Sequence, residues 1–366
     1  MVVDLGRQPA SDHFPGITDP GPDPQWPLQV WHCPNCALVQ LGPIAALDEE
    51  PVRAVESQTS RDHARRVVAA VLAERPWLAG GTVREFASHH GGSWLEALQE
   101  HGCRPEPGGP AALVIDVHAL AHEENVRAAL DQRVAVLAEG GLLILEFHHL
   151  LPLVEQAQFD TIRHGHWTYL SLTTVERLGA ERGLTVVQAV AEPVFGGSLR
   201  LVLTHESSAH RMDESVRALL AAERRAGLHD GSGLERLQER ARASAAALHS
   251  FLSEQRAAGR RVLGYGAPSK AAVLLGVADV GPHLLEFTVD AAPAKHGLAV
   301  PGVRVPIRPV QDLVAARPEV VLVLTWDIAE EVMSYLEDGG GWGTQYVLPV
   351  PTPHTVQPAA MQGAMR

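Results

Sequence analysis

The stretches AALVIDVH (Ala111 to His118) and GGLLILEFHH (Gly140 to His149) decide the fold. Both are nearly continuous apolar runs, which are typical of parallel strands that are buried on both faces. The segment VRAALDQRVAVLAE (126–139) between them has apolar residues at helical spacing. A strand, a helix and a second strand in this order predict a parallel sheet that is covered by helices.

The same pattern extends in both directions from these strands. Upstream, DHARRVVAAVLAE (62–74) predicts a helix, and GTVREFA (81–87) predicts the first strand of the sheet. Downstream, TVVQAVAEPV (185–194) and SLRLVLTHE (198–206) predict two antiparallel strands that close the sheet. Residues 212–259 have a helical pattern with a break at HDGSG, which indicates a connector between two domains.

A second α/β unit follows the connector. RRVLGYGAP (260–268) leads a strand into a turn that contains glycine, AAVLLGV (271–277) predicts a helix, and EVVLVLTW (319–326) predicts another strand. We therefore predict an α/β protein with two Rossmann-like domains. The predicted boundaries are 1–60 for a small irregular N-terminal module, 61–210 for the first α/β domain, 211–259 for the helical connector and 260–366 for the C-terminal domain.

Composition excludes several classes of function. The formal net charge of -13 argues against a nucleic-acid partner, because phosphate binding requires clustered Lys and Arg. No apolar run approaches the roughly 20 residues that span a bilayer, and the N-terminus has none of the parts of a signal peptide. Three cysteines make no disulfide framework. We expect a cytoplasmic protein without a membrane partner, either a monomer or a homodimer.

Several motifs together resemble a known family. They are DLGRQP, PLQVWHCPNCALVQL, IDVHALAH, FDTIRHGHWTYLSL, GGSLR, GYGAPSKAAVLL, VDAAPAKHG with PGVRVPI, and VLTWDIAEEV. In order and spacing they resemble the sugar C-methyltransferases of antibiotic deoxysugar pathways. The resemblance implies an N-terminal zinc module, a class I methyltransferase domain and a Rossmann-like C-terminal domain. It also implies that a base removes the proton beside the ketone of a dTDP-4-keto-deoxysugar, and that the enolate attacks the methyl group of S-adenosylmethionine.

Two cofactor sites depart from the family pattern. The family's zinc module resembles two CxxC pairs, but this chain has only Cys33 and Cys36, so we do not expect structural zinc there. The family's cofactor loop resembles EIGSNDG, and its cofactor-binding positions correspond here to Glu85, Ser88 and Gly91. Imidazoles at His89 and His90 crowd this loop, and the segment after it is too short for the helix and acidic second strand that would bind the ribose. We therefore expect that S-adenosylmethionine binding is lost or atypical.

The resemblance also implies residues that act on the sugar. The family's YHEH motif appears here as Arg163, His164, Gly165 and His166, which makes these cation and imidazole groups candidates for catalysis. A neutral imidazole at His166 is suited to remove a proton next to a ketone, and His164 could orient it. Candidate contacts for the substrate, a nucleotide-linked sugar, are Tyr265, Lys270, Lys295, Arg200 and Trp326. The alternative is that these residues are only structural.

Histidines accumulate at the predicted strand ends. Because the carboxyl ends of parallel strands open onto one crevice, we expect these side chains to converge. Imidazole and carboxylate ligands suit a divalent metal such as Fe, Zn, Ni, Mn or Co. The alternative is that they are separate polar residues. The candidate ligands are His89, His90, His118, His122, His148, His149 and Glu146.

Three functions remain open from the sequence. The first is a metal-assisted enzyme that enolises a keto-sugar nucleotide without S-adenosylmethionine, leading to epimerisation, isomerisation, dehydration or oxidation. The second is C-methylation with an atypical cofactor site. The third is a non-catalytic protein that binds a sugar nucleotide or acts as a scaffold.

Overall fold

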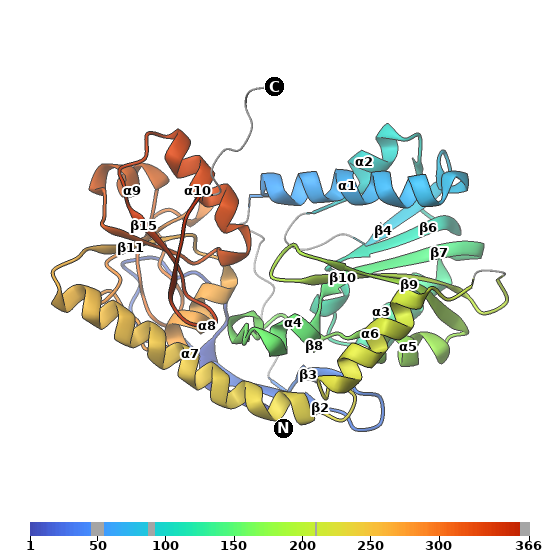
Figure 1. The fold of residues 1–366 in the computed structure, drawn as a ribbon, viewed down its shortest axis with the longest axis horizontal. Helices are drawn as coiled ribbons and strands as arrows, with labels where there is room; N and C mark the ends of the chain where they lie inside the picture. The colour runs from blue at the N-terminus through green and yellow to red at the C-terminus, as the bar shows by residue number, and fades with distance from the viewer. Residues whose placement is uncertain (45–54, 87–91, 209–210, 359–366) are drawn as a thin grey trace.

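Three sheets organise the protein in the computed structural model, which describes residues 1–44, 55–86, 92–208 and 211–358 (Figure 1). One sheet belongs to the N-terminal part, one to the central domain and one to the C-terminal domain. Among the described helices, none is both long enough and apolar enough to cross a membrane.

The N-terminal part forms a sheet, so the prediction of an irregular module was wrong. Its strands pair in the order β1-β2-β3-β8, all antiparallel. Alternate residues such as Val3, Leu5, Leu28 and Val30 are buried on one face. The strands were hard to recognise because three are short or interrupted and the fourth comes from a distant segment. They are β1 (Val3–Pro9), β2 (Gln25–His32), β3 (Val39–Leu41) and β8 (Thr168–Tyr169).

The central sheet has the order β5-β4-β6-β7-β10-β9. Strands β4 to β7 are parallel, whereas β10 runs antiparallel between β7 and β9. This reversed strand near one edge is the arrangement of class I methyltransferases, so the predicted fold class is confirmed. The strands are β4 (Thr82–Phe86), β5 (Arg104–Pro105), β6 (Ala111–Val117), β7 (Leu137–His148), β9 (Leu184–Glu192) and β10 (Ser198–His205).

Helices cover both faces of the central sheet, which explains its continuous apolar strands. Leu113 and Ile115 of β6 pack against α1 and α2, whereas Val114 packs on the opposite face with α3, α5 and α6. The helices are α1 (Gln58–Glu74), α2 (Leu95–Glu100), α3 (Val126–Ala135), α5 (Leu172–Ala180) and α6 (Glu214–Arg225).

The segment after the cofactor loop contains more regular secondary structure than the sequence suggested. We expected it to lack both a helix and a second strand, and this expectation was wrong. Helix α2 and the two-residue strand β5 both fit between Gly92 and Ala111, and β5 pairs in parallel with β4. A strand of two residues is too short to leave a pattern of hydrophobicity in the sequence.

The C-terminal sheet has the order β13-β12-β11-β14-β15-β16, with only β16 antiparallel. This is the strand order of a Rossmann fold, in which ligands bind at the carboxyl edge. The strands are β11 (Val262–Tyr265), β12 (Thr288–Val289), β13 (Ile307–Arg308), β14 (Val320–Val323), β15 (Gln345–Leu348) and β16 (His354–Val356). The helices are α8 (Ser269–Val277), α9 (Val310–Ala316) and α10 (Ala329–Asp338).

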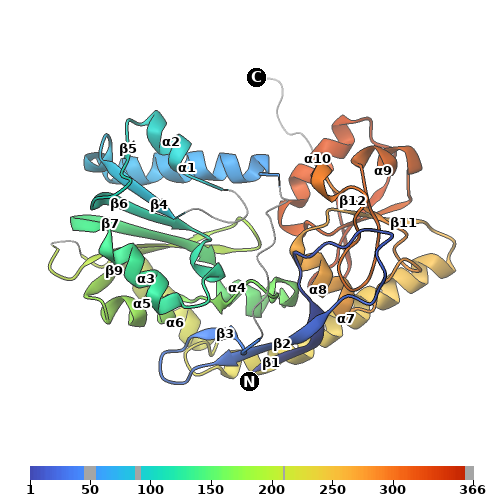
Figure 2. The same ribbon diagram turned by 180° about the vertical axis from the view of Figure 1, so that it is seen from behind.

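Helix α7 (Ser232–Ala257) runs along the base of the molecule and links the two α/β domains (Figures 1 and 2). It packs with β1, β2 and α8 in one hydrophobic core. On the other side, the carboxylate of Glu331 in α10 accepts hydrogen bonds from the backbone of Gln58 and Thr59 in α1. The remaining short elements are α4 (Leu150–Glu155), η1 (Pro76–Leu78), η2 (Leu120–His122), η3 (Phe159–Thr161), η4 (Pro293–Lys295) and η5 (Trp326–Ile328).

Glycine at position 264 is required by the close packing of β11 on β12. A Cβ at Gly264 would lie 2.6 Å from Oγ1 and 2.7 Å from Cβ of Thr288. We expect Gly264→Ala to reduce the free energy of unfolding by about 1–3 kcal/mol, because the added methyl group overpacks a buried strand. Urea unfolding would measure the change.

The matched control is Gly108→Ala, because a Cβ at Gly108 would meet no atom within 4 Å. This variant should change the unfolding free energy by less than about 0.5 kcal/mol. Equal unfolding midpoints for Gly264→Ala and the unmodified protein would contradict the packing described for β11.

Candidate functional site

A cavity of about 650 Å³ lies between the central and C-terminal domains. Gly92, Val117 and His118 line it from the carboxyl edge of the central sheet, and Tyr265 and Gly266 line it from the first strand of the C-terminal sheet. The carboxyl edges of both parallel sheets therefore face the same space. This is where ligands bind in open α/β folds.

Four histidines converge in this cavity: His118, His122, His148 and His166. The ring centroids of His118 and His148 are 5.2 Å apart, those of His148 and His166 are 6.2 Å apart, and those of His122 and His166 are 4.5 Å apart. The structure therefore places these four side chains around one cavity. His118 follows β6, and His148 ends the neighbouring strand β7.

Two other candidate ligands point elsewhere. His149 lies next to His148, but Nε2 of its ring is 2.7 Å from Oε1 of Glu223 in α6, and the residue is buried outside the cavity lining. Successive side chains of an extended segment point in opposite directions, so His148 and His149 could not both face the site. Glu146 is fully buried beneath the lining, and it contacts histidines rather than the cavity.

The predicted metal site finds no support. Within residues 1–44, 55–86, 92–208 and 211–358, no group of three or more His, Cys, Asp or Glu side chains is arranged to hold a metal ion. His89 and His90 lie outside the described residues. Imidazole nitrogens must approach a metal to about 2.0–2.1 Å, which is a far stricter requirement than sharing one cavity.

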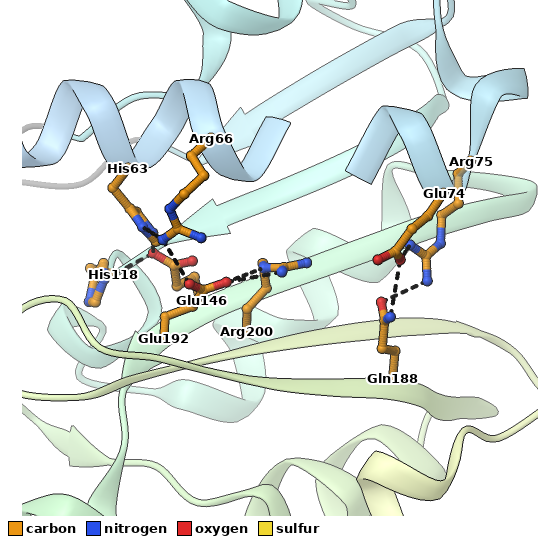
Figure 3. A network of polar contacts seen from close by, with 9 residues as sticks. All are labelled: His63, Arg66, Glu74, Arg75, His118, Glu146, Gln188, Glu192 and Arg200. Atoms are coloured by element: carbon orange, nitrogen blue, oxygen red, sulfur yellow. Dashed lines mark hydrogen bonds and ion pairs between the residues drawn. The ribbon is translucent and has the colours of Figure 1, made fainter. Parts of the chain in front are cut away.

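A network of polar contacts lies beneath the histidines (Figure 3). Oε1 of Glu146 is 2.7 Å from Nε2 of His63 in α1 and 3.5 Å from Nε2 of His118. Burial alone would raise the pKa of Glu146, but the nearby imidazole of His118 and the hydrogen bond from His63 outweigh it and lower this pKa to about 2. The sequence analysis did not single out His63, because one histidine on the apolar face of a helix gives no functional signal.

Arg200 belongs to the second half of this network. Its guanidinium pairs with Glu192 at 3.0 Å, and Glu192 also pairs with Arg66 at 2.9 Å (Figure 3). Arg200 is buried and does not line the cavity. Its predicted contact with substrate is therefore not supported by its position, and it joins β10 to β9 and α1 instead.

Some residues of the motif from Arg163 to His166 line the cavity, and others have a structural role. Arg163 and His166 line the cavity, and Arg163 pairs with Asp12 at 2.9 Å. His164 is buried away from the lining, with its ring nitrogens 3.1 Å from the carbonyl oxygen of Pro9 and 3.3 Å from that of Pro27. The orienting role predicted for His164 is therefore not supported, because this ring joins the N-terminal sheet to the central domain.

The C-terminal wall carries Lys270. Nζ of Lys270 lies 2.5 Å from Oδ1 of Asp327 and 3.9 Å from the ring centroid of Trp326. Trp326 does not line the cavity; its Nε1 donates a hydrogen bond to the buried Asp160 at 2.7 Å. Burial raises the pKa of Asp160 to about 6, against the opposing effects of Lys270 and Trp326. A Cβ at Gly196 would lie 2.6 Å from this ring.

Lys295 and Tyr265 complete this wall. Nζ of Lys295 donates to the carbonyl oxygen of Ala267 at 2.9 Å and to Asp290 at 3.3 Å. Burial raises the pKa of Tyr265, so its hydroxyl stays neutral. The structure therefore brings Tyr265, Lys270 and Lys295 together in one cavity, as expected. The sequence did not reveal that Asp290 and Asp327 already pair with the two lysines.

The cofactor would bind at the carboxyl edge of the central sheet, and the described residues at this edge can be compared with what the cofactor requires. Gly92 adopts a φ of +87°, and its amide donates to Glu56 at 2.8 Å. Because glycine has no side chain, only backbone atoms form the cavity wall at this position. Glu106 directly follows β5, the position from which an acidic residue reaches a ribose in such sheets. Glu85 accepts from the amide of Trp94 at 2.7 Å and thereby anchors α2. Of these three residues, Gly92 lines the cavity, whereas Glu85 and Glu106 do not, and the carboxylate of Glu106 accepts from the amides of Gly108 and Gly109. Ser88 and Gly91 lie outside the described residues.

The N-terminal module does not fit zinc in its described residues. Cys33 and Cys36 lie together in a turn, and hydrogen bonds from the backbone of Cys36 and Asn35 lower the pKa of Cys33. No further ligand joins them within the part of the chain that the structure describes. Two thiolates leave a tetrahedral zinc ion with half of its ligands.

Comparison with solved structures finds methyltransferases. Magnesium protoporphyrin IX methyltransferase from Synechocystis PCC 6803, with bound SAH, aligns with a TM-score of 0.31 and 15% identity over 40% of this chain and 84% of that protein. The N-methyltransferase NodS from Bradyrhizobium japonicum aligns with a TM-score of 0.30 and 14% identity over 41% of this chain and 99% of that protein.

Comparison of sequences extends along the whole chain. The family described as "C-methyltransferase C-terminal domain" matches residues 193–351, and the family described as "Putative zinc binding domain" matches residues 1–49. C-methyltransferase NovU of Streptomyces niveus is 28% identical over 398 aligned residues, which cover 97% of this chain and 94% of that protein. The resemblance expected from the motifs is thereby confirmed, because both family models and the C-methyltransferase relative match this chain.

Proposed function

We propose that this protein transfers a methyl group from S-adenosylmethionine to a carbon of a nucleotide-linked keto-sugar in secondary-metabolite biosynthesis. The observation that carries the proposal is the single cavity onto which the carboxyl edges of both α/β sheets open. A cofactor bound at one edge and a sugar nucleotide bound at the other would meet there. It is preferred over the metal-assisted reaction that the sequence suggested, because the similarity of the chain to a C-methyltransferase favours methyl transfer.

The substrate's diphosphate would bind at the C-terminal wall. Helix α8 begins at Ser269 next to the glycine turn, and the N-terminus of a helix favours anions. Lys270 and Lys295 line the cavity beside it. The contacts of Lys270 with Trp326 and Asp327 hold its ammonium group in place before any ligand arrives.

The sugar ring would then lie toward the four histidines. A neutral imidazole has an ordinary pKa of about 6.5 and is suited to remove the acidic proton next to a ketone. The resemblance points to His166, whose ring lies 4.5 Å from that of His122. When bound at the carboxyl edge of the central sheet near Gly92, S-adenosylmethionine would supply an electrophilic methyl group for the carbon that has lost its proton.

The test is an assay of proton removal and methyl transfer on a dTDP-4-keto-6-deoxysugar in D₂O. With S-adenosylmethionine present, we expect a product that is heavier by one methylene group. Without it, we expect the carbon next to the ketone to take up deuterium, because deprotonation does not require the methyl donor. Mass spectrometry follows both reactions.

Deuterium uptake that never leads to methylation would overturn the proposal and would favour an enzyme that only enolises the sugar. Absence of both reactions across several keto-sugar nucleotides would instead favour a binding or scaffold protein. Titration with S-adenosylmethionine provides a check that is independent of the sugar.

The diphosphate site gives a second prediction. We expect Lys270→Met to weaken the binding of dTDP by about tenfold, since one cation contact contributes about 1.4 kcal/mol. Asp327→Asn should not weaken binding, because it removes a carboxylate that competes for the same ammonium group. Calorimetry at two salt concentrations measures both effects.

The control is Arg261→Met, which removes an exposed cation of the same domain that pairs with Glu286 and does not line the cavity. Its dTDP affinity should equal that of the unmodified protein. Equal affinities for Lys270→Met and Arg261→Met would show that the diphosphate lies elsewhere.

A further inference from the structure

A buried carboxylate lies directly behind one of the cavity histidines. Glu146 of β7 is fully buried, and its Oε1 faces Nε2 of His118 at 3.5 Å (Figure 3). His118 lines the cavity and retains 14% exposure of its side chain. An imidazole between a carboxylate and a substrate cavity is the arrangement that enzymes use to orient a general base.

His63 is the other partner of Glu146, and its contacts define which ring nitrogen carries the proton. A guanidinium can only donate, and the Arg66 guanidinium lies 2.9 Å from Nδ1 of His63, so this nitrogen must accept. The proton of His63 is then on Nε2, which donates to Glu146 at 2.7 Å. His63 is therefore a neutral donor that holds the carboxylate in place.

The charge on Glu146 persists at neutral pH. Burial opposes it, but the nearby imidazole of His118 and the hydrogen bond from His63 lower the pKa of Glu146 to about 2. Within the described residues, Nε2 of His118 is buried and has no hydrogen-bond partner, and the carboxylate at 3.5 Å favours a proton on this nitrogen, which leaves the lone pair on Nδ1. It also stabilises the positive charge that forms on the imidazole during proton removal.

The backbone reinforces this placement. His118 has a φ of 57°, in the left-handed region that side chains other than glycine seldom adopt, and such strain concentrates at functional sites. Its amide donates to the carbonyl oxygen of Glu146 at 2.7 Å, so both ends of the residue are tied to β7. The other groups around its ring are His148, His63 and Phe195.

We propose that His118 is a general base of the cavity and that Glu146, held by His63, is its positioning residue. This inference rests on the proposed function. His118 accepts the proton from the carbon next to the ketone, the electron pair of that bond forms the enolate, and Glu146 stabilises the imidazolium. The enolate carbon would then bond to the methyl group of S-adenosylmethionine as the bond from that methyl to sulfur breaks, with S-adenosylhomocysteine as the leaving group, and the imidazolium returns its proton to water. The motifs of the resemblance point to His166 instead.

The test compares three variants in the D₂O assay. His118→Asn should lower the rate of deuterium uptake by at least about 100-fold, as expected for loss of a general base. Glu146→Gln keeps the size of the side chain but loses its charge, and it should lower kcat by at least about tenfold with little change in KM. Structural damage alone would not give this split between kcat and KM.

Glu223→Gln is the matched control. Glu223 is equally buried and lies 2.7 Å from His149, but this pair is outside the cavity. We expect it to lower the unfolding midpoint while leaving the rate of deuterium uptake unchanged. Wild-type rates in folded His118→Asn protein would overturn the inference while leaving the proposed function intact, whereas a wild-type protein without either reaction would contradict the proposed function itself.

A second measurement does not depend on turnover or on the folding of the Glu146 variant. NMR of protein labelled with ¹⁵N-histidine, assigned by comparison with His118→Asn, reports which ring nitrogen carries the proton. We expect the proton of neutral His118 on Nε2, with Nδ1 bare. A proton on Nδ1 would overturn the proposed orientation.

Discussion

The parallel pairing of β6 with β7 is the constraint on which the site depends. In this register Val117 lies beside Glu146, so the residue after β6 and the last residues of β7 emerge at one edge. His118 and His148 meet there because their strands end together. The same pairing buries Glu146 beneath them. A buried carboxylate normally costs several kcal/mol unless it is compensated, and here the hydrogen bond from His63 and the contact with His118 compensate it.

The two α/β domains share one cavity because three segments join them. Helix α7 crosses the base, and the N-terminal sheet packs against α7 and α8 in the same core. Asp12 of the N-terminal part contacts both Arg163 of the central domain and Ser269 at the start of α8. The N-terminal module is therefore a joint between the domains, and this role requires no metal ion.

Much of the fold could be predicted from the sequence, because strands buried on both faces leave continuous apolar runs. Strand β5 has two residues and β8 is separated from its partners by most of the central domain, so neither leaves a local pattern. The convergence of His118 and His148 followed from strand order alone. Strand order could not predict a metal site in the same way, because a shared location does not fix the orientation of the ring nitrogens. The acidic partner of Lys270 comes from a loop that is distant in sequence, which spacing does not reveal, whereas Asp290 lies five residues before Lys295.

The contact between Trp326 and Gly196 has a consequence for how such a molecule can change. The indole lies where any side chain at position 196 would stand, and its other contacts hold Asp160 and Lys270. The size of the Trp326 ring thus sets the separation between the central and C-terminal domains at this contact. A chain with a larger residue at 196 would need a smaller one at 326, and the lysine above it would lose its platform. The two positions are therefore in steric contact, although 130 residues separate them in the sequence.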